Sequence, residues 1–226
     1  MHIHRAPHRW SVTSARAIAI QKRLAPLVQK QPPHGPVRLV AGVDAAFSHD
    51  EQRCIAGVVL WEVREQVVVE QHIAIRRLRF PYIPGLLSFR EAPAVLAALR
   101  KLRMQPDVVL YDGHGLAHPR RFGVACHVGV ITGIPAIGCA KSRLIGTHCA
   151  VQTRRGASVP LTDHGEIIGS VLRTQAGVRP VYVSVGHRMD LRTAERLILA
   201  CAPRYRLPEP TRLADQLVAA AKRECS

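Results

Sequence analysis

The sequence has no apolar run long enough to cross a bilayer, for which a helix needs roughly 18–20 consecutive apolar residues. Its beginning, Met1 to Trp10, is basic and rich in histidine and has no apolar signal core. The six cysteines are scattered, without a Cys-x-x-Cys pair or a compact Cys/His group of zinc-site spacing. These absences argue against a membrane protein and a zinc module, and we expect a cytoplasmic protein with reduced thiols and no membrane partner.

Acidic residues are few, 16 Asp and Glu against 32 Lys and Arg, and the formal net charge is +16. Such a charge exceeds what solubility requires and favours polyanionic partners, chiefly nucleic acid or an anionic membrane surface, although a merely basic surface is the alternative. With 226 residues, 47% of them hydrophobic, the chain can bury a sizeable core. We therefore expect one domain over residues 1–226, in which residues 1–11 form a flexible basic N-terminus.

Hydrophobic periodicity predicts three antiparallel strands followed by alternating strands and helices. The predicted helices are residues 13–29, 91–103, 122–132, 191–201 and 211–222. The predicted strands are residues 37–47, 54–63, 67–75, 108–111, 134–140 and 181–185, and residues 146–165 are expected to be irregular with short strands. This order predicts an α/β fold of ribonuclease H-like layout, with a central mixed sheet of the five-stranded type and helices on both faces.

Two predicted strands lead into aspartates, Asp44 and Asp112. Both acids can lie on one edge of a sheet, where a divalent cation would offset their desolvation and mutual repulsion. Glu91 could add a third ligand from the following helix. Alternatively, Ser88 and Glu91 form a capping box, although Pro93 argues against that register. Oxygen ligands suit Mg²⁺, or Mn²⁺ in its place, and a metal-bound water can attack phosphorus, with one metal ion or two.

The loop at residues 80–85, FPYIPG, holds Tyr82 and Ile83 between prolines that fix the backbone. In one interpretation the loop folds these apolar side chains back onto the core. In the other it presents a wedge that enters a base stack. The loop residues alone leave both interpretations open.

Several local motifs resemble those of the endonuclease V family, the deoxyinosine 3′ endonucleases. In chain order they are PYIPGLLSFRE at 81–91, DGHG at 112–115, HPRRFG at 118–123, IGCAKSRL at 137–144, VGHR at 185–188 and RLPEPTR at 206–212. The resemblance covers residues from about 12 to 215 and keeps the same order throughout.

The resemblance implies a DNA repair endonuclease that hydrolyses the second phosphodiester bond 3′ to a deaminated base and leaves 3′-hydroxyl and 5′-phosphate ends. It implies that Asp44, Glu91 and Asp112 bind the metal, with Asp215 as a weaker candidate, and that Lys141 completes the catalytic set near the scissile phosphate. The residues implied to contact the DNA or the flipped base are Tyr82, Ile83, Pro84, Gly85, Leu87, Gly113, Gly115, His118, Arg120 and Arg121.

Within this set Tyr82 matches the wedge, and glycines suit a pocket in which backbone groups reach a base edge. His114, His127 and His187 have no assigned role. The alternatives are an inosine-specific ribonuclease or another ribonuclease H-like nuclease, and last a module that binds lesions without cutting. We expect a monomer whose partner is inosine-containing DNA, with inosine-containing RNA as the alternative substrate.

Overall fold

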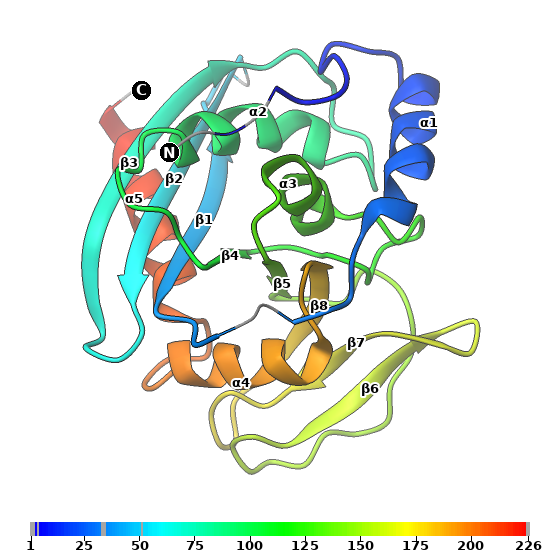
Figure 1. Cartoon of the computed structure of the whole chain (residues 1–226), viewed down its shortest axis with the longest axis vertical. Helices are drawn as coiled ribbons and strands as arrows, with labels where there is room; N and C mark the ends of the chain where they lie inside the picture. Colours follow the sequence, from blue (N-terminus) through cyan, green and yellow to red (C-terminus); the bar gives the residue numbers. More distant parts are fainter. Residues whose placement is uncertain (1–2, 4, 33–34, 51, 225–226) are drawn as a thin grey trace.

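The computed structural model describes residues 3, 5–32, 35–50 and 52–224, and its central sheet begins with three antiparallel strands (Figure 1). These are β1 (Leu39–Phe47), β2 (Arg53–Glu62) and β3 (Val67–Arg77). They pair in chain order because short connections join each strand to the next. The meander predicted from the sequence is confirmed.

Five further strands extend the sheet beyond β1. β4 (Val108–Tyr111) lies parallel to β1, and β5 (Ala136–Ala140) lies parallel to β4. The remaining three strands alternate in direction: β8 (Val181–His187) is antiparallel to β5, β7 (Glu166–Leu172) is antiparallel to β8, and β6 (Ser158–Asp163) is antiparallel to β7. Over the described ranges the eight strands form one sheet in the order β3-β2-β1-β4-β5-β8-β7-β6. The first five correspond to the predicted five-stranded core, and the predicted mixed α/β layout is confirmed.

β7 was not among the strands predicted from the sequence. A glycine, Gly169, lies in the middle of this strand, and glycine is depleted in strands. The structure gives its reason: a Cβ on Gly169 would lie 2.4 Å from the carbonyl oxygen of Val183 in the neighbouring strand β8. The residue that weakens the strand pattern is therefore needed for the close approach of β8.

Helices cover both faces of the sheet. They are α1 (Ser14–Leu24), which continues into the short 3₁₀ helix η1 (Ala25–Leu27), then α2 (Ser88–Leu99), α3 (Val124–Thr132), α4 (Leu191–Cys201) and α5 (Glu209–Glu224). On β2, Ala56 and Val58 pack in one core cluster with residues of α2. Gly57, between them, faces α5, where a Cβ would lie 2.8 Å from Val218. Figure 1 shows the same arrangement, with α2 in front of the strands and α5 behind them.

The start of α2 differs from both registers considered for it. Leu87 is the N-cap and no side chain caps the helix, so Ser88 and Glu91 do not form a capping box. Pro93 lies inside the helix and not at its first position. A proline at this position cannot donate to the carbonyl oxygen four residues earlier, and the helix nevertheless continues through it to Leu99. Glu91 consequently lies in the first turn of α2.

The beginning of the chain packs against the core. Ile3 is buried, and Trp10 packs against both large hydrophobic clusters. Residues 1–11 were expected to form a flexible basic N-terminus, and this packing was not foreseen from the sequence. Among the described helices, none combines the length and the apolar character needed to cross a membrane.

Candidate active site

Two acids meet at one edge of the sheet because of the register of two parallel strands. Val43 of β1 pairs with Tyr111 of β4, and Asp44 and Asp112 are the residues that directly follow this pair. The backbone N–H of Asp112 points to the carbonyl oxygen of Val43 at 3.5 Å. The structure thus confirms that these two strands bring both aspartates to the same edge.

The close approach of α5 to β1 brings a third acid to this edge. A Cβ on Gly42 would lie 2.1 Å from the carbonyl carbon of Pro210, so glycine lets the first turn of α5 lie directly on β1. Asp215, further along α5, lies 3.8 Å from the ammonium nitrogen of Lys141. Its side chain is about half exposed, unlike that of Asp112, which is 11% exposed.

Lys141 follows β5 and reaches back to the acids. Its Nζ lies 2.6 Å from Oδ2 of Asp112. Partial burial lowers the pKa of Lys141. The hydrogen bond and charge of Asp112, with the charges of Asp215 and Asp44, outweigh this effect, and the net pKa is raised. The lysine is therefore protonated and supplies the positive charge at this edge.

Glu91 approaches from the α2 side of the sheet. It is buried, and its Oε2 accepts a hydrogen bond of 2.8 Å from the hydroxyl of Tyr111. Burial raises the pKa of Glu91 to about 8; the Tyr111 hydrogen bond opposes this, and the charges of Asp44 and Asp112 add to it. Glu91 is thus electrostatically coupled to both aspartates.

The pKa of Asp44 is raised for the same reasons. Burial, then the charges of Asp112 and Asp215, raise the pKa of Asp44 to about 7, against the opposing effect of Lys141. Carboxylates held together in this way are stabilised by a cation, and an all-oxygen donor set suits a hard divalent ion. In chemical terms Asp44, Glu91 and Asp112 fit such an ion.

The geometry adds a condition to that fit. Across the described ranges, no three His, Cys, Asp or Glu side chains stand close enough together to hold a metal ion as they are. Asp112 is bonded to Lys141, and Glu91 is bonded to Tyr111. Both carboxylates would have to turn from these partners toward Asp44 to share one ion.

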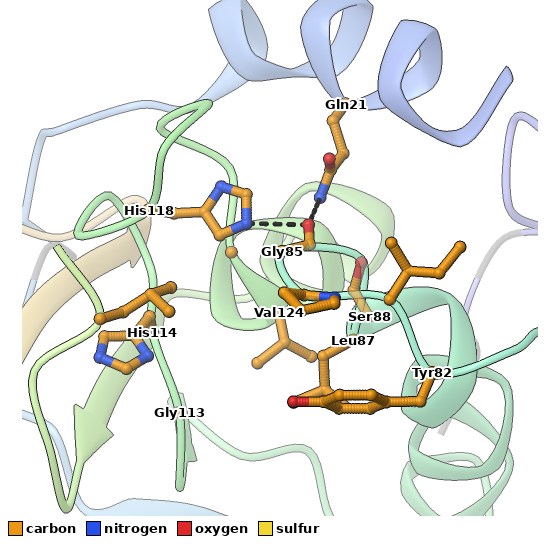
Figure 2. Close-up of a pocket in the computed structure, with 13 residues that line it drawn as sticks. Gln21, Tyr82, Gly85, Leu87, Ser88, Gly113, His114, His118 and Val124 are labelled. Atoms are coloured by element: carbon orange, nitrogen blue, oxygen red, sulfur yellow. Dashed lines mark hydrogen bonds between the residues drawn. The ribbon is translucent and has the colours of Figure 1, made fainter. Parts of the chain in front are cut away.

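A cavity of about 240 Å³ opens beside the acids (Figure 2). Its lining comes from α1, the loop before α2, the start of α2, the turn after β4, the start of α3 and the segment after β5. The lining residues are Gln21, Tyr82, Ile83, Pro84, Gly85, Leu87, Ser88, Gly113, His114, His118, Gly123, Val124 and Leu144. We call Asp44, Glu91 and Asp112 the acid cluster. Gly113 and His114 directly follow Asp112 in the chain, so the cavity and the acid cluster share one turn.

The two apolar residues of the loop before α2 lie in different environments. Tyr82 is 67% exposed, and Figure 2 shows it projecting on one side of the cavity while His114 lies on the other. Ile83 is half-buried and packs against the core. The interpretation of a loop folded onto the core holds for Ile83, whereas the exposure of Tyr82 favours a wedge.

One carbonyl group fixes the shape of the cavity. The oxygen of Gly85 accepts from Gln21 Nε2 at 3.0 Å, from His118 Nε2 at 3.0 Å and from Arg120 Nη2 at 2.6 Å. The backbone N–H of Arg120 donates to His118 Nδ1, so the proton of a neutral His118 ring is on Nε2. Burial lowers the pKa of His118 to about 4, and Gly85 only partly offsets it, which agrees with a neutral ring.

Three of the residues expected to contact nucleic acid make contacts within the protein. Arg120 holds Gly85 and the side chain of Gln21. Arg121 pairs with Asp163 at 2.8 Å and Glu166 at 2.7 Å in the β6–β7 hairpin. Gly115 is buried and does not line the cavity; a Cβ there would lie 2.1 Å from the carbonyl oxygen of Val185. The structure therefore gives these three residues a role in shaping the site from within.

Gln21 was not predicted as part of the site. It shares the buried face of α1 with Ala17, Ile20 and Leu24, at the helical spacing of a core stripe. A polar side chain at such a position needs buried partners, and here they are the carbonyl oxygens of Gly85 and Phe122. A polar residue within the apolar stripe was the available signal.

The histidines without an assigned role lie in three places. His114 lines the cavity, with Nε2 at 3.1 Å from the carbonyl oxygen of Ser142. His127 is fully buried and bonds Ser88 through Nδ1 and His8 through Nε2. His187 is buried beside α3 and away from the acids; burial and then Arg188 lower the pKa of His187 to about 4.

Comparison with known proteins gives consistent results. The family model described as endonuclease V matches residues 22–216. An endonuclease V of Roseiflexus sp. (strain RS-1) is 53% identical over 208 residues, which cover 92% of this chain and 93% of that relative. The crystal structure of the Streptomyces avermitilis endonuclease V superimposes with a TM-score of 0.92 at 42% identity and covers 99% of both chains.

A second similar structure contains nucleic acid. It is the Ciona intestinalis endonuclease V in complex with a 24mer DNA containing an inosine followed by a ribo-adenosine. Its TM-score is 0.83 at 25% identity, and the match covers 94% of this chain and 98% of that one.

Proposed function

The chain belongs to the endonuclease V family of nucleases, and on that premise we propose that it is a DNA repair endonuclease specific for deoxyinosine. It hydrolyses the second phosphodiester bond 3′ to the lesion and leaves 3′-hydroxyl and 5′-phosphate ends. It acts as a monomer in the cytoplasm.

One observation carries the proposal: the acid cluster and the cavity share the turn that begins at Asp112. A base flipped out of a duplex and held against Gly113 would keep its own sugar-phosphate backbone beside Asp112. An enzyme that must recognise one base and cut close to it needs this proximity. The cavity therefore serves recognition and the neighbouring edge serves hydrolysis.

The start of α2 supports selection of a deaminated purine. Leu87 and Ser88 line the cavity, and no side chain caps this helix. The N–H groups of the next three residues already donate to the carbonyl oxygens of Leu86 and Leu87, so the donors offered to a base are those of Leu87 and Ser88. A helix N-terminus presents backbone N–H donors and a partial positive charge. Hypoxanthine has a carbonyl oxygen at the position where adenine has an amino group, so these donors favour the deaminated base.

Tyr82 supports base flipping. Its exposed ring lies at the cavity between residues whose backbone is restrained by Pro81 and Pro84. A rigidly presented ring can occupy the space that the flipped base leaves and so reduce the cost of unstacking. We assign the wedge role to Tyr82 alone, because Ile83 packs inward.

Hydrolysis requires a divalent metal, Mg²⁺ or Mn²⁺ in its place, held by Asp44, Glu91 and Asp112. When bound, such an ion supplies an activated water and stabilises the leaving 3′-oxygen. Tyr111 and Lys141 hold Glu91 and Asp112 at this edge, and both carboxylates would turn from these partners to reach the ion. Lys141 also places a positive charge where the negative charge of the scissile phosphate increases. Asp215 can tune this charge through Lys141, because it lies at the same ammonium group.

Inosine-containing RNA is the second candidate substrate. The relative from Ciona intestinalis was crystallised with DNA in which a ribo-adenosine follows the inosine. A ribose in that position of a relative's complex makes a 2′-hydroxyl beside the lesion compatible with the fold. We rank DNA first for this chain, with RNA as the alternative.

The proposal is tested by nicking of an end-labelled duplex with one deoxyinosine, beside the same duplex with adenine in its place. We expect cutting of the inosine duplex with Mg²⁺, and none with EDTA or with adenine. Equal cutting of both duplexes, or cutting that persists in EDTA, would refute it.

A further inference from the structure

A second cavity, of about 590 Å³, is lined mainly by arginine side chains. We call it the arginine groove; its arginines are Arg9, Arg76, Arg77, Arg79 and Arg90. They come from the N-terminal segment, from the end of β3 and the residues after it, and from α2. The residues that line this groove include no acid.

The N-terminal wall of the groove is fixed by packing. The Trp10 ring centroid lies 5.9 Å from that of Phe89 on α2 and 5.1 Å from that of His127 on α3. His8 Nε2 lies 2.8 Å from His127 Nε2. Arg9 is held between these two anchored residues, and Figure 1 shows the segment running beside α2. This wall lies outside the residues 22–216 that match the family model.

Among the described residues, the exposed arginines of the groove have no acidic partner. In the part of the chain that the structure describes, no ion pair joins Arg9, Arg76, Arg77 or Arg79 to a carboxylate. An alternative explanation is that arginines at the end of an edge strand hinder its pairing with a strand of another chain. That explanation covers Arg76 and Arg77 on β3, but not Arg9 or Arg79, which lie outside any strand. Like charges gathered from separate segments favour a polyanion.

Arg90 joins the groove to the candidate active site. Its guanidinium carbon lies 4.3 Å from the ring centroid of Phe47, at the end of the strand that carries Asp44. The same carbon lies 6.0 Å from the ring centroid of Tyr82. A nucleic-acid strand that passes Tyr82 can therefore continue directly along the arginine groove.

We propose that the arginine groove binds the phosphate backbone of the nucleic acid that flanks the inosine on one side. This inference rests on the proposed function, because the inosine in the cavity determines which flank reaches the groove. Arg9, Arg76, Arg77 and Arg79 contact the phosphates, and Arg90 adds charge from the floor.

The test uses a variant in which Arg76, Arg77 and Arg79 are all changed to Gln. The matched control changes Arg192, Arg196 and Arg204, three exposed arginines on and after α4, to Gln, so that both variants lose the same charge. Equilibrium Kd values are measured in EDTA at several salt concentrations. The three inosine duplexes have two long flanks, a shortened 5′ flank or a shortened 3′ flank. Unmodified protein is assayed in parallel for Mg²⁺-dependent cutting.

We expect the groove variant to bind the long duplex about tenfold more weakly, with a salt slope smaller by about 2 to 3. The loss should persist with one shortened duplex and disappear with the other, while the control variant stays within about threefold of the unmodified protein. A groove variant that binds like the control, or that loses affinity equally for all three duplexes, would overturn the inference. Failure of the unmodified protein to cut would instead overturn the proposed function.

Discussion

The ammonium group of Lys141 lies 2.6 Å from a carboxylate oxygen of Asp112, and this ion pair joins the residues that follow β5 and β4. Without the lysine, three coupled acids and the half-exposed Asp215 would face one another at a single edge of the sheet. The pair therefore holds the Asp112 side chain in a fixed orientation in the protein as it stands. It also defines what a metal ion has to displace.

Changing Asp112 to Asn should separate binding from cutting. We expect the cutting rate of an inosine duplex to fall by roughly 10³-fold or more, since a lost metal ligand removes several kcal/mol of transition-state stabilisation. The Kd for the same duplex should stay similar or improve, because one negative charge beside the phosphate is gone. Single-turnover cutting and fluorescence anisotropy check the two parts. An Asp112→Asn protein that still cuts would contradict the assigned mechanism.

The stability of the metal-free protein should depend on Asp44 in a defined direction. Because the folded-state pKa of Asp44 is raised to about 7, chiefly by burial, this group stabilises the fold below its ordinary pKa, and the contribution is lost as pH rises through 7. From pH 5 to pH 8 we expect the unfolding free energy of the unmodified protein to decrease more than that of the Asp44→Asn variant. The difference should be on the order of 1–3 kcal/mol.

Thermal unfolding in EDTA at both pH values measures this difference. Comparison with Asp44→Asn isolates the one carboxyl group from the histidines that titrate in the same range. The variant should be the more stable protein at pH 8, although it cannot cut. Parallel pH profiles of the two proteins would show that folding does not raise the pKa of Asp44.

Removing the ring of Tyr82 should affect paired substrates most. Flipping a base from a duplex costs a few kcal/mol, and the wedge offsets part of that cost. We expect Tyr82→Ala to lower kcat/KM on an inosine duplex by about tenfold or more, with a much smaller effect on single-stranded DNA. Tyr82→Phe is the control and should retain most activity. Because the side chain is 67% exposed, neither change should alter Tm appreciably. Equal losses on both substrates would rule out the wedge role.

Gln21 should matter for both stability and recognition. Its Nε2 donates to the carbonyl oxygens of Gly85 and Phe122, and its Oε1 accepts from Arg120. Gln21→Leu keeps a similar volume but removes the donor to the buried carbonyl oxygen of Phe122 and the acceptor of Arg120 Nε, at a cost of about 1–3 kcal/mol, while Gly85 keeps His118 and Arg120 as donors. Denaturant unfolding measures the loss. Because Gly85 lines the cavity, discrimination between inosine and adenine should fall as well. Unchanged discrimination would mean that Gln21 only supports the fold.

Local patterns were sufficient to predict the meander, the parallel strands and the aspartates that follow them. Strand register then determines the rest for Asp44 and Asp112, because acids that follow paired residues of adjacent parallel strands must be neighbours. Contacts between distant segments were beyond reach. The burial of Gln21 against Gly85 and the pairing of Arg121 with Asp163 depend on tertiary packing, and no local spacing encodes them. The role of Gly115 is similar, since only the position of Val185 explains it.

The position of the cut tests the central claim most directly. Labelled duplex DNA with one deoxyinosine, and single-stranded RNA of the same sequence with one inosine, are incubated with the protein and Mg²⁺, and the products are mapped to single-nucleotide resolution. We predict cleavage of the DNA at the second phosphodiester bond 3′ to the inosine, with 3′-hydroxyl and 5′-phosphate ends. Preference for the RNA would assign the protein to inosine-containing transcripts. Binding of both substrates without cleavage of either would contradict the account.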